Sequence, residues 1–91
     1  MIIQIKVKVK TDMLKEFGEK LMSGKLDRSA IISETYCEKD EPSIGISYWK
    51  VEDLKEFENK FSFWKPYYEE VEIKEVIRAK EAMMLLFSKK F

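Results

Sequence analysis

Two kinds of hydrophobic periodicity follow one another along this chain, and their order limits the fold more than any other feature. Residues 1–10 alternate between apolar and polar side chains, which is the period-two pattern of a half-buried strand. The apolar set is Ile3, Ile5, Val7 and Val9, and the polar set is Gln4, Lys6, Lys8 and Lys10. A helix is predicted next, with a cap at Thr11 or Asp12, apolar side chains every three or four residues, and a stop at Gly24.

Strand and helix patterns continue to alternate toward the C-terminus. Strands are predicted over 29–38 and 44–51, and the polar turn between them indicates a hairpin. Asp53, with Glu56 three residues later, predicts the start of a second helix, and Pro66 predicts that this helix breaks at the preceding residue. A fourth strand is predicted over about 70–78 and a short apolar helix over 79–87.

This order of elements predicts an α+β fold. Right-handed crossovers over a hairpin give the ferredoxin-like βαββαβ sandwich, a four-stranded antiparallel sheet with two helices on one face, here with an extra C-terminal helix. A chain of 91 residues wraps a single core, so we expect residues 1–91 to form one domain.

Composition argues against several partners. Lys+Arg and Asp+Glu both number 17, so no net charge attracts nucleic acid or an anionic membrane, and we expect neither as a partner. No apolar run approaches the roughly 18 residues that a membrane span needs. Cys37 is the only cysteine, which excludes an intramolecular disulfide, and the first residues lack a signal-peptide pattern. We therefore expect a cytoplasmic protein.

One face of the predicted sheet is left uncovered by the two main helices. Lys6 and Lys8 point to it if the apolar residues of the first strand meet the helices. The third strand adds one of two pairs to that face, either Ile46 and Tyr48 or Ser47 and Trp49. The face is either solvated, or it closes on the same face of a second copy and leaves a partly polar cavity. The terminal helix is apolar nearly all round, which favours burial in a homodimer.

The C-terminal third carries a resemblance to a known group of proteins. The run from Phe63 to Val76, FWKPYYEEVEIKEV, followed by Glu81 and Ala82, resembles the second half of an uncharacterised family in the dimeric α+β barrel superfamily. That superfamily includes antibiotic-biosynthesis monooxygenases and stress-responsive barrel proteins. The resemblance implies the barrel fold and dimerisation, and it implies no particular activity.

The chain lacks the residues that several common classes of active site need. Zinc sites and activated cysteine nucleophiles commonly depend on histidine, and the sequence contains none. Cys37, without such a base, is expected to be a packing residue. The carboxylates Glu69, Glu70 and Glu72 are typical of a solvated face, so we expect no metal and no cofactor.

These observations favour a protein that binds a small ligand, anionic or aromatic, in a sheet-lined cavity. The predicted ligand-binding residues are Lys6, Lys8, Tyr48 and Trp49, with Trp64 and Tyr67 at the mouth. Lysines in a partly enclosed site favour an anionic ligand.

Two alternatives stay open. A cofactor-independent monooxygenase or isomerase needs mainly an apolar pocket, an aromatic group and a polar anchor. Residues that offer such groups are Tyr48, Trp49, Asn59, Trp64 and Tyr67. We assign no catalytic residue, because aromatic residues at helical spacing are also typical of a core. The other alternative is a structural or protein-interaction module whose cavity is filled by side chains.

Overall fold

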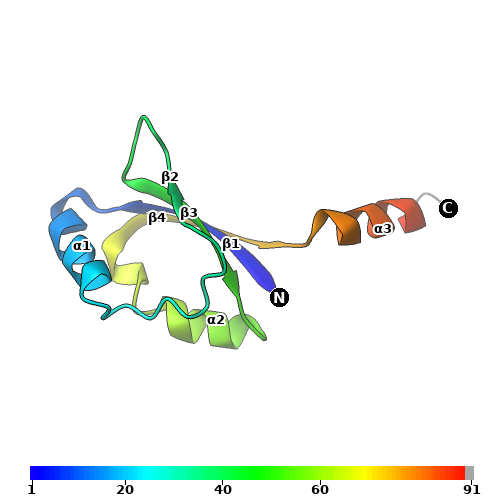
Figure 1. The fold of residues 1–91 in the computed structure, drawn as a ribbon, viewed down its shortest axis with the longest axis horizontal. Coiled ribbons are helices and arrows are strands. Elements are labelled where there is room, and N and C mark those ends of the chain that lie inside the picture. The colour runs from blue at the N-terminus through cyan, green and yellow to red at the C-terminus, as the bar shows by residue number, and fades with distance from the viewer. Residues whose placement is uncertain (90–91) are drawn as a thin grey trace.

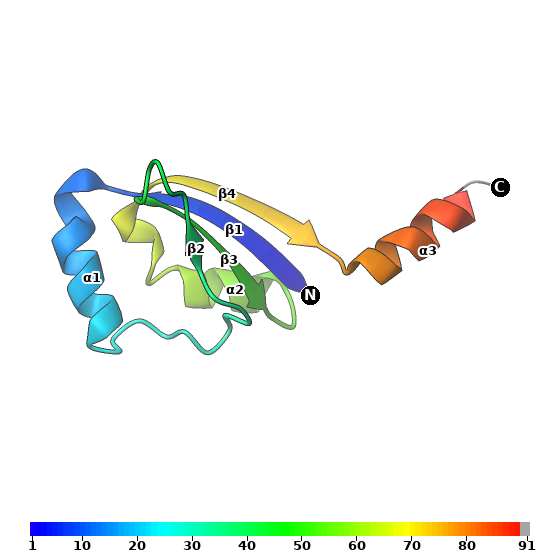
Figure 2. The same cartoon turned by 45° about the horizontal axis from the view of Figure 1, so that its top comes forward.

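The computed structural model describes residues 1–89, which form a four-stranded antiparallel sheet with three helices. The strands are β1 (Ile2–Val9), β2 (Tyr36–Cys37), β3 (Ile44–Lys50) and β4 (Tyr68–Val76), in the order β2-β3-β1-β4. The helices are α1 (Leu14–Met22), α2 (Leu54–Phe61) and α3 (Ala79–Lys89), with short 3-10 turns at Thr11–Met13 and Lys65–Tyr67. Helices α1 and α2 lie on one face of the sheet, and α3 projects beyond its end (Figures 1 and 2). The predicted α+β ferredoxin-like fold is confirmed.

Strand β1 is one of the two central strands of the sheet, because it pairs with β3 on one side and β4 on the other. Its alternation is preserved in space, as Ile3 and Ile5 are each only 1% exposed on the side of α1 and α2. Lys6 and Lys8 lie on the other side, which we call the open face because neither α1 nor α2 covers it (Figure 2).

The core between the sheet and the two helices is largely aromatic. The Trp49 side chain is 2% exposed, and its ring makes T-shaped contacts with Phe57, Phe61 and Trp64 at centroid distances of 5.7, 5.8 and 5.5 Å. Each such pair adds about 0.5–1.5 kcal/mol beyond the area it buries. Trp49 therefore faces the helices, which decides between the two orientations that the sequence allowed. Tyr48 lies on the open face.

The second strand is much shorter than predicted. Of residues 29–38, only the two residues of β2 form a strand, and Ile31 adds one isolated bridge to Trp49. Residues 32–35 lie between these two contacts, opposite only two residues of β3. Because four residues face two, the segment 32–35 must bulge away from β3, and the regular pairing between the strands is interrupted there. The prediction of a continuous strand over 29–38 is therefore wrong, although both its ends contact β3.

The observed helix ends agree only in part with those predicted from the sequence. Neither Thr11 nor Asp12 caps α1, because both lie in a 3-10 turn and Met13 occupies the N-cap position without a side-chain hydrogen bond. The stop at Gly24 is confirmed, with a φ of +74° that glycine adopts without a steric penalty. The start of α2 is also confirmed. The amide of Glu56 donates to the Asp53 carboxylate at 2.8 Å, and the amide of Glu52 donates to the Glu56 carboxylate at 2.8 Å.

Helix α3 projects away from the sheet in the single chain (Figure 1), and most of its apolar side chains are exposed. Its burial in a homodimer stays a prediction. The exposed residues are Met83, Met84, Leu85, Leu86 and Phe87. Within residues 1–89, no helix has both the length and the apolar character to cross a membrane.

The cap of α2 gives a direct test of this local structure. Asp53→Ala removes the carboxylate that accepts from the amide of Glu56, so we expect the free energy of unfolding to fall by about 1 kcal/mol. Asp53→Asn keeps an accepting oxygen and should lower the free energy of unfolding only slightly. Urea unfolding followed by circular dichroism measures both variants, and equal losses would contradict the assigned cap.

Candidate functional site

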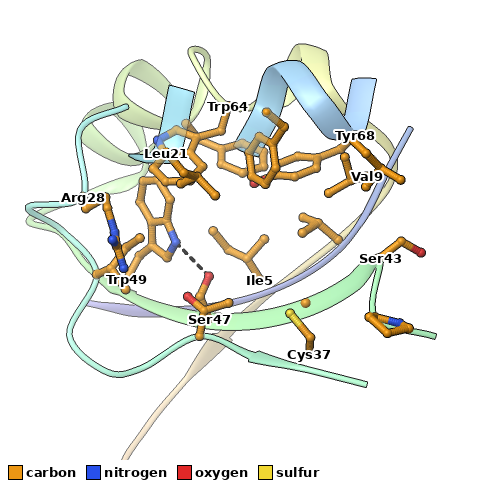
Figure 3. A pocket seen from close by; sticks show the side chains of 18 residues that line it. Ile5, Val9, Leu21, Arg28, Cys37, Ser43, Ser47, Trp49, Trp64 and Tyr68 are labelled. Atoms are coloured by element: carbon orange, nitrogen blue, oxygen red, sulfur yellow. Dashed lines mark hydrogen bonds between the residues drawn. The ribbon is translucent and has the colours of Figure 1, made fainter. Parts of the chain in front are cut away.

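A cavity of about 330 Å³ lies between the helix-covered face of the sheet and the helices, and 18 residues line it (Figure 3). Its lining is mostly hydrocarbon and aromatic. Strand β1 contributes Ile5, Val7 and Val9 through the same alternation that builds the core. Helix α1 contributes Phe17 and Leu21. The period-two strand and the apolar stripe of the helix therefore form opposite walls.

Aromatic rings make up much of the remaining wall. Trp49 and Trp64, the two tryptophans of the sequence, both line the cavity. The ring of Phe17 lies 6.1 Å from that of Trp64 and 5.6 Å from that of Tyr68, and both pairs are T-shaped. This enclosure holds the rings in fixed positions and offers their faces and edges to a bound molecule.

Polar groups in the cavity are few. The Trp49 indole N–H donates to the Ser47 hydroxyl at 3.1 Å, and Arg28 is the one charged residue among those lining the cavity. Burial raises the pKa of the Tyr68 phenol above its ordinary value of 10.0. Cys37, expected to be a packing residue, lines the cavity and is exposed with a free thiol.

The indole N–H of Trp64 has a different environment. It is buried and has no hydrogen-bond acceptor among the described residues. Leaving such a donor unpaired costs about 1–3 kcal/mol. Because this atom is enclosed by protein, we do not count it as a group that a ligand contacts.

The structure does not bring the six predicted site residues together. Trp49 and Trp64 line the cavity, and Tyr67 is buried in the adjacent core without lining it. Lys6, Lys8 and Tyr48 lie on the open face. The sheet itself therefore separates the lysines from the tryptophans.

On the open face, each lysine already has acidic neighbours. The Lys8 ammonium lies 2.8 Å from the Glu41 carboxylate and 3.4 Å from the Glu69 carboxylate. The Lys6 ammonium lies 3.5 Å from the Glu38 carboxylate. Hydrogen bonding to Glu41, attraction by its charge and weaker contributions from Glu69 raise the pKa of Lys8. An anionic ligand on this face would have to compete with them.

Tyr48 and the acidic strand complete the open face. The Gln4 amide donates to the Tyr48 hydroxyl at 3.2 Å. A hollow of about 420 Å³ also occurs here, with Lys6 and Lys8 facing Glu70 and Glu72. Among residues 1–89, no group of three or more His, Cys, Asp and Glu side chains is placed to hold a metal ion.

Several cavity residues were missed by sequence reasoning. Arg28 lies in the irregular segment between α1 and β2, where no periodicity indicates which way a side chain points. The position of Ser47 follows from that of Trp49, because the two residues are two positions apart on β3 and therefore lie on the same face. Tyr68 could have been identified only with the correct start of β4, two residues before the predicted one.

Comparison with known proteins gives no relative by sequence: no family model matches the chain, and no curated protein matches it. Several solved structures match in fold. One is a putative antibiotic biosynthesis monooxygenase from Bacteriodes thetaiotaomicron VPI-5482, with a TM-score of 0.57 and 14% identity, covering 87% of this chain and 89% of that one.

Two further structures have the same arrangement. A 5-chloro-2-hydroxyhydroquinone dehydrochlorinase from Burkholderia phenoliruptrix AC1100, in complex with 2,5-dihydroxybenzoquinone, matches with a TM-score of 0.55 and 13% identity, over 89% of this chain and 98% of that one. Protein Atu4242 from Agrobacterium tumefaciens matches with a TM-score of 0.50 and 11% identity, over 87% and 96%. The chain thus shares the ferredoxin-like fold of antibiotic-biosynthesis-monooxygenase-like proteins, and the resemblance seen in the sequence is confirmed for the fold.

Proposed function

We propose that the protein binds a small molecule with a flat, largely apolar body in the cavity between the sheet and the helices. The observation that carries this proposal is the cavity itself, about 330 Å³ in volume and lined mainly by apolar and aromatic side chains. That volume lies at the lower end of the range for ligand pockets, which suits a compound of one or two rings. A module whose interior is filled by side chains has no need of such a space.

The fold comparison supports an aromatic or quinone-like ligand. The dehydrochlorinase of the same fold is described in complex with 2,5-dihydroxybenzoquinone, a flat molecule of one ring. The rings of Phe17, Trp49 and Tyr68 offer comparable surfaces here.

A second candidate function is a cofactor-independent monooxygenase or isomerase that acts on the bound aromatic molecule. The Tyr68 side chain that lines the cavity favours it, because a phenol hydroxyl can donate a hydrogen bond to a substrate oxygen. Product formation from a hydroxylated aromatic compound, without added metal or flavin, separates this function from simple binding. Unchanged compound after prolonged aerobic incubation would contradict it.

Binding in this cavity is testable through two neighbouring residues of β1 that face opposite ways. Val7 lines the cavity and Lys8 lies on the open face. Saturable quenching of tryptophan fluorescence by 2,5-dihydroxybenzoquinone or 2-naphthol is expected, because both tryptophans line the cavity. Val7→Phe should raise the Kd at least tenfold by filling the space, and Lys8→Ala should leave it unchanged.

The opposite result, in which Lys8→Ala raises the Kd and Val7→Phe does not, would place the ligand on the open face. Leu21→Phe fills the same cavity from α1 and serves as a second variant. Circular dichroism of each variant checks that it is folded.

We propose further that the protein is a homodimer in which the second copy covers α3. In the single chain, the side chains of Met84 and Leu86 are 65% and 64% exposed. An apolar helix of 11 residues is marginal in water without packing partners, so contact with another surface stabilises it.

The open face supports a second copy of this chain as that partner. Lys6 and Lys8 of β1 lie in register with Glu72 and Glu70 of β4, so the face carries a row of each sign. A two-fold axis places such a surface against itself, and the lysine row of one copy can meet the glutamate row of the other. The equal numbers of acidic and basic residues leave no net repulsion between copies.

Light scattering coupled to size-exclusion chromatography tests this dimer. The wild-type protein should have twice the chain mass of 10.9 kDa. Leu86→Glu places a charge on the apolar helix and should give a monomer, whereas Lys80→Glu on the same helix should leave the dimer intact. A monomeric wild-type protein at micromolar concentration would contradict the proposal.

A cytoplasmic location is part of the same proposal. Cys37 is the single cysteine and its thiol is free and exposed. Such a thiol suits a reducing compartment.

A further inference from the structure

The chemistry of the proposed ligand can be narrowed, because the polar groups that line the cavity include one positive charge and no negative one. Arg28 is this charge, and no carboxylate lies within ion-pairing distance of it among residues 1–89. A guanidinium stays protonated at all physiological pH values and presents its donors in a planar fork that matches a carboxylate. Its donors are therefore available to a ligand.

Ser47 adds a second donor in the same cavity. Its hydroxyl oxygen accepts from the Trp49 indole N–H at 3.1 Å, and the hydroxyl hydrogen has no acceptor among the described residues. A serine hydroxyl rotates to suit its partners, so this hydrogen can point to a ligand oxygen. In Figure 3, Arg28, Trp49 and Ser47 are labelled on the same side of the cavity.

We propose that Arg28 and Ser47 bind an anionic oxygen of the ligand, so that the ligand is an aromatic acid: a ring system bearing a carboxylate or an acidic hydroxyl. This inference rests on the proposed function, because it assigns the ligand class of the same cavity. The apolar walls hold the ring, and the two donors hold the charged oxygen. A cationic ligand finds no carboxylate to pair with among the residues lining this cavity.

This assignment differs from the one drawn from the sequence, in which Lys6 and Lys8 attract the anion. Both lysines lie on the far side of the sheet from Trp49 and within 4.0 Å of carboxylates. Arg28 takes over the predicted role of positive anchor in the cavity that the tryptophans line.

The expected contribution of Arg28 is moderate, because its side chain is exposed to solvent at the edge of the cavity. Solvent weakens a charge pair at such a position, while hydrogen bonds to a charged group are stronger than neutral ones. We expect loss of the guanidinium to lower the affinity for an aromatic acid roughly tenfold.

A matched pair of probes, 2-naphthoate and its neutral amide 2-naphthamide, tests the inference by isothermal titration calorimetry of the full chain. The wild-type protein should prefer 2-naphthoate. Arg28→Gln should lower the affinity for 2-naphthoate roughly tenfold and leave that for 2-naphthamide unchanged. Arg28→Lys should restore part of the loss. Lys25→Gln, which removes an equal charge three residues away from Arg28 and outside the cavity, serves as the control.

The outcomes separate this inference from the proposed function. If both probes bind equally and Arg28→Gln changes neither, the cavity binds aromatic molecules and the assignment of an acid is wrong. If Lys25→Gln lowers the affinity for 2-naphthoate as much as Arg28→Gln does, Arg28 has no specific role. If neither probe binds, both the proposed function and this inference are overturned.

Discussion

The packing of one indole ring joins the sheet of this protein to its helices. Trp49 projects from β3 and contacts Phe57 and Phe61 of α2 and Trp64 of the following turn. Both α1 and α2 lie on the face of the sheet that carries Trp49, and a cavity lined by residues of β1, β3 and α1 remains between that face and the helices. The same indole orients Ser47 through its N–H, so a core contact also sets the polar part of the candidate site.

The two faces of the sheet differ in chemical character. The face that carries Ile5 and Val7 forms a core and a cavity, and the face that carries Lys6 and Lys8 is a charged surface, the one proposed to meet a second copy. The period-two alternation of β1 produces this division, because successive side chains on a strand point to opposite faces of the sheet. The proposed ligand site and the proposed dimer contact therefore lie on opposite sides of β1.

Much of the fold could be predicted from the sequence because its signals are local. The alternation of residues 1–10 and the capping box at Asp53 depend on neighbours within four residues, and both are confirmed. The interruption at 32–35 was missed because it depends on register with β3, a contact distant in sequence. The side to which Trp49 points could not be decided, since both sets of residues on β3 mix polar and apolar types, and the site was consequently assigned to both faces. Arg28 lies where no periodic pattern exists.

The proposed function requires that a flat ligand enters the cavity between the sheet and the helices. Heteronuclear NMR of the labelled protein, titrated with 2-naphthoate, tests it most directly, because indole N–H signals are resolved and the two tryptophans both line the cavity. We expect saturable shifts of both indole signals and little change in the signal of the Gln4 side-chain amide, which donates to the Tyr48 hydroxyl on the open face. Shifts confined to the Gln4 amide, with both indole signals unmoved, would contradict it.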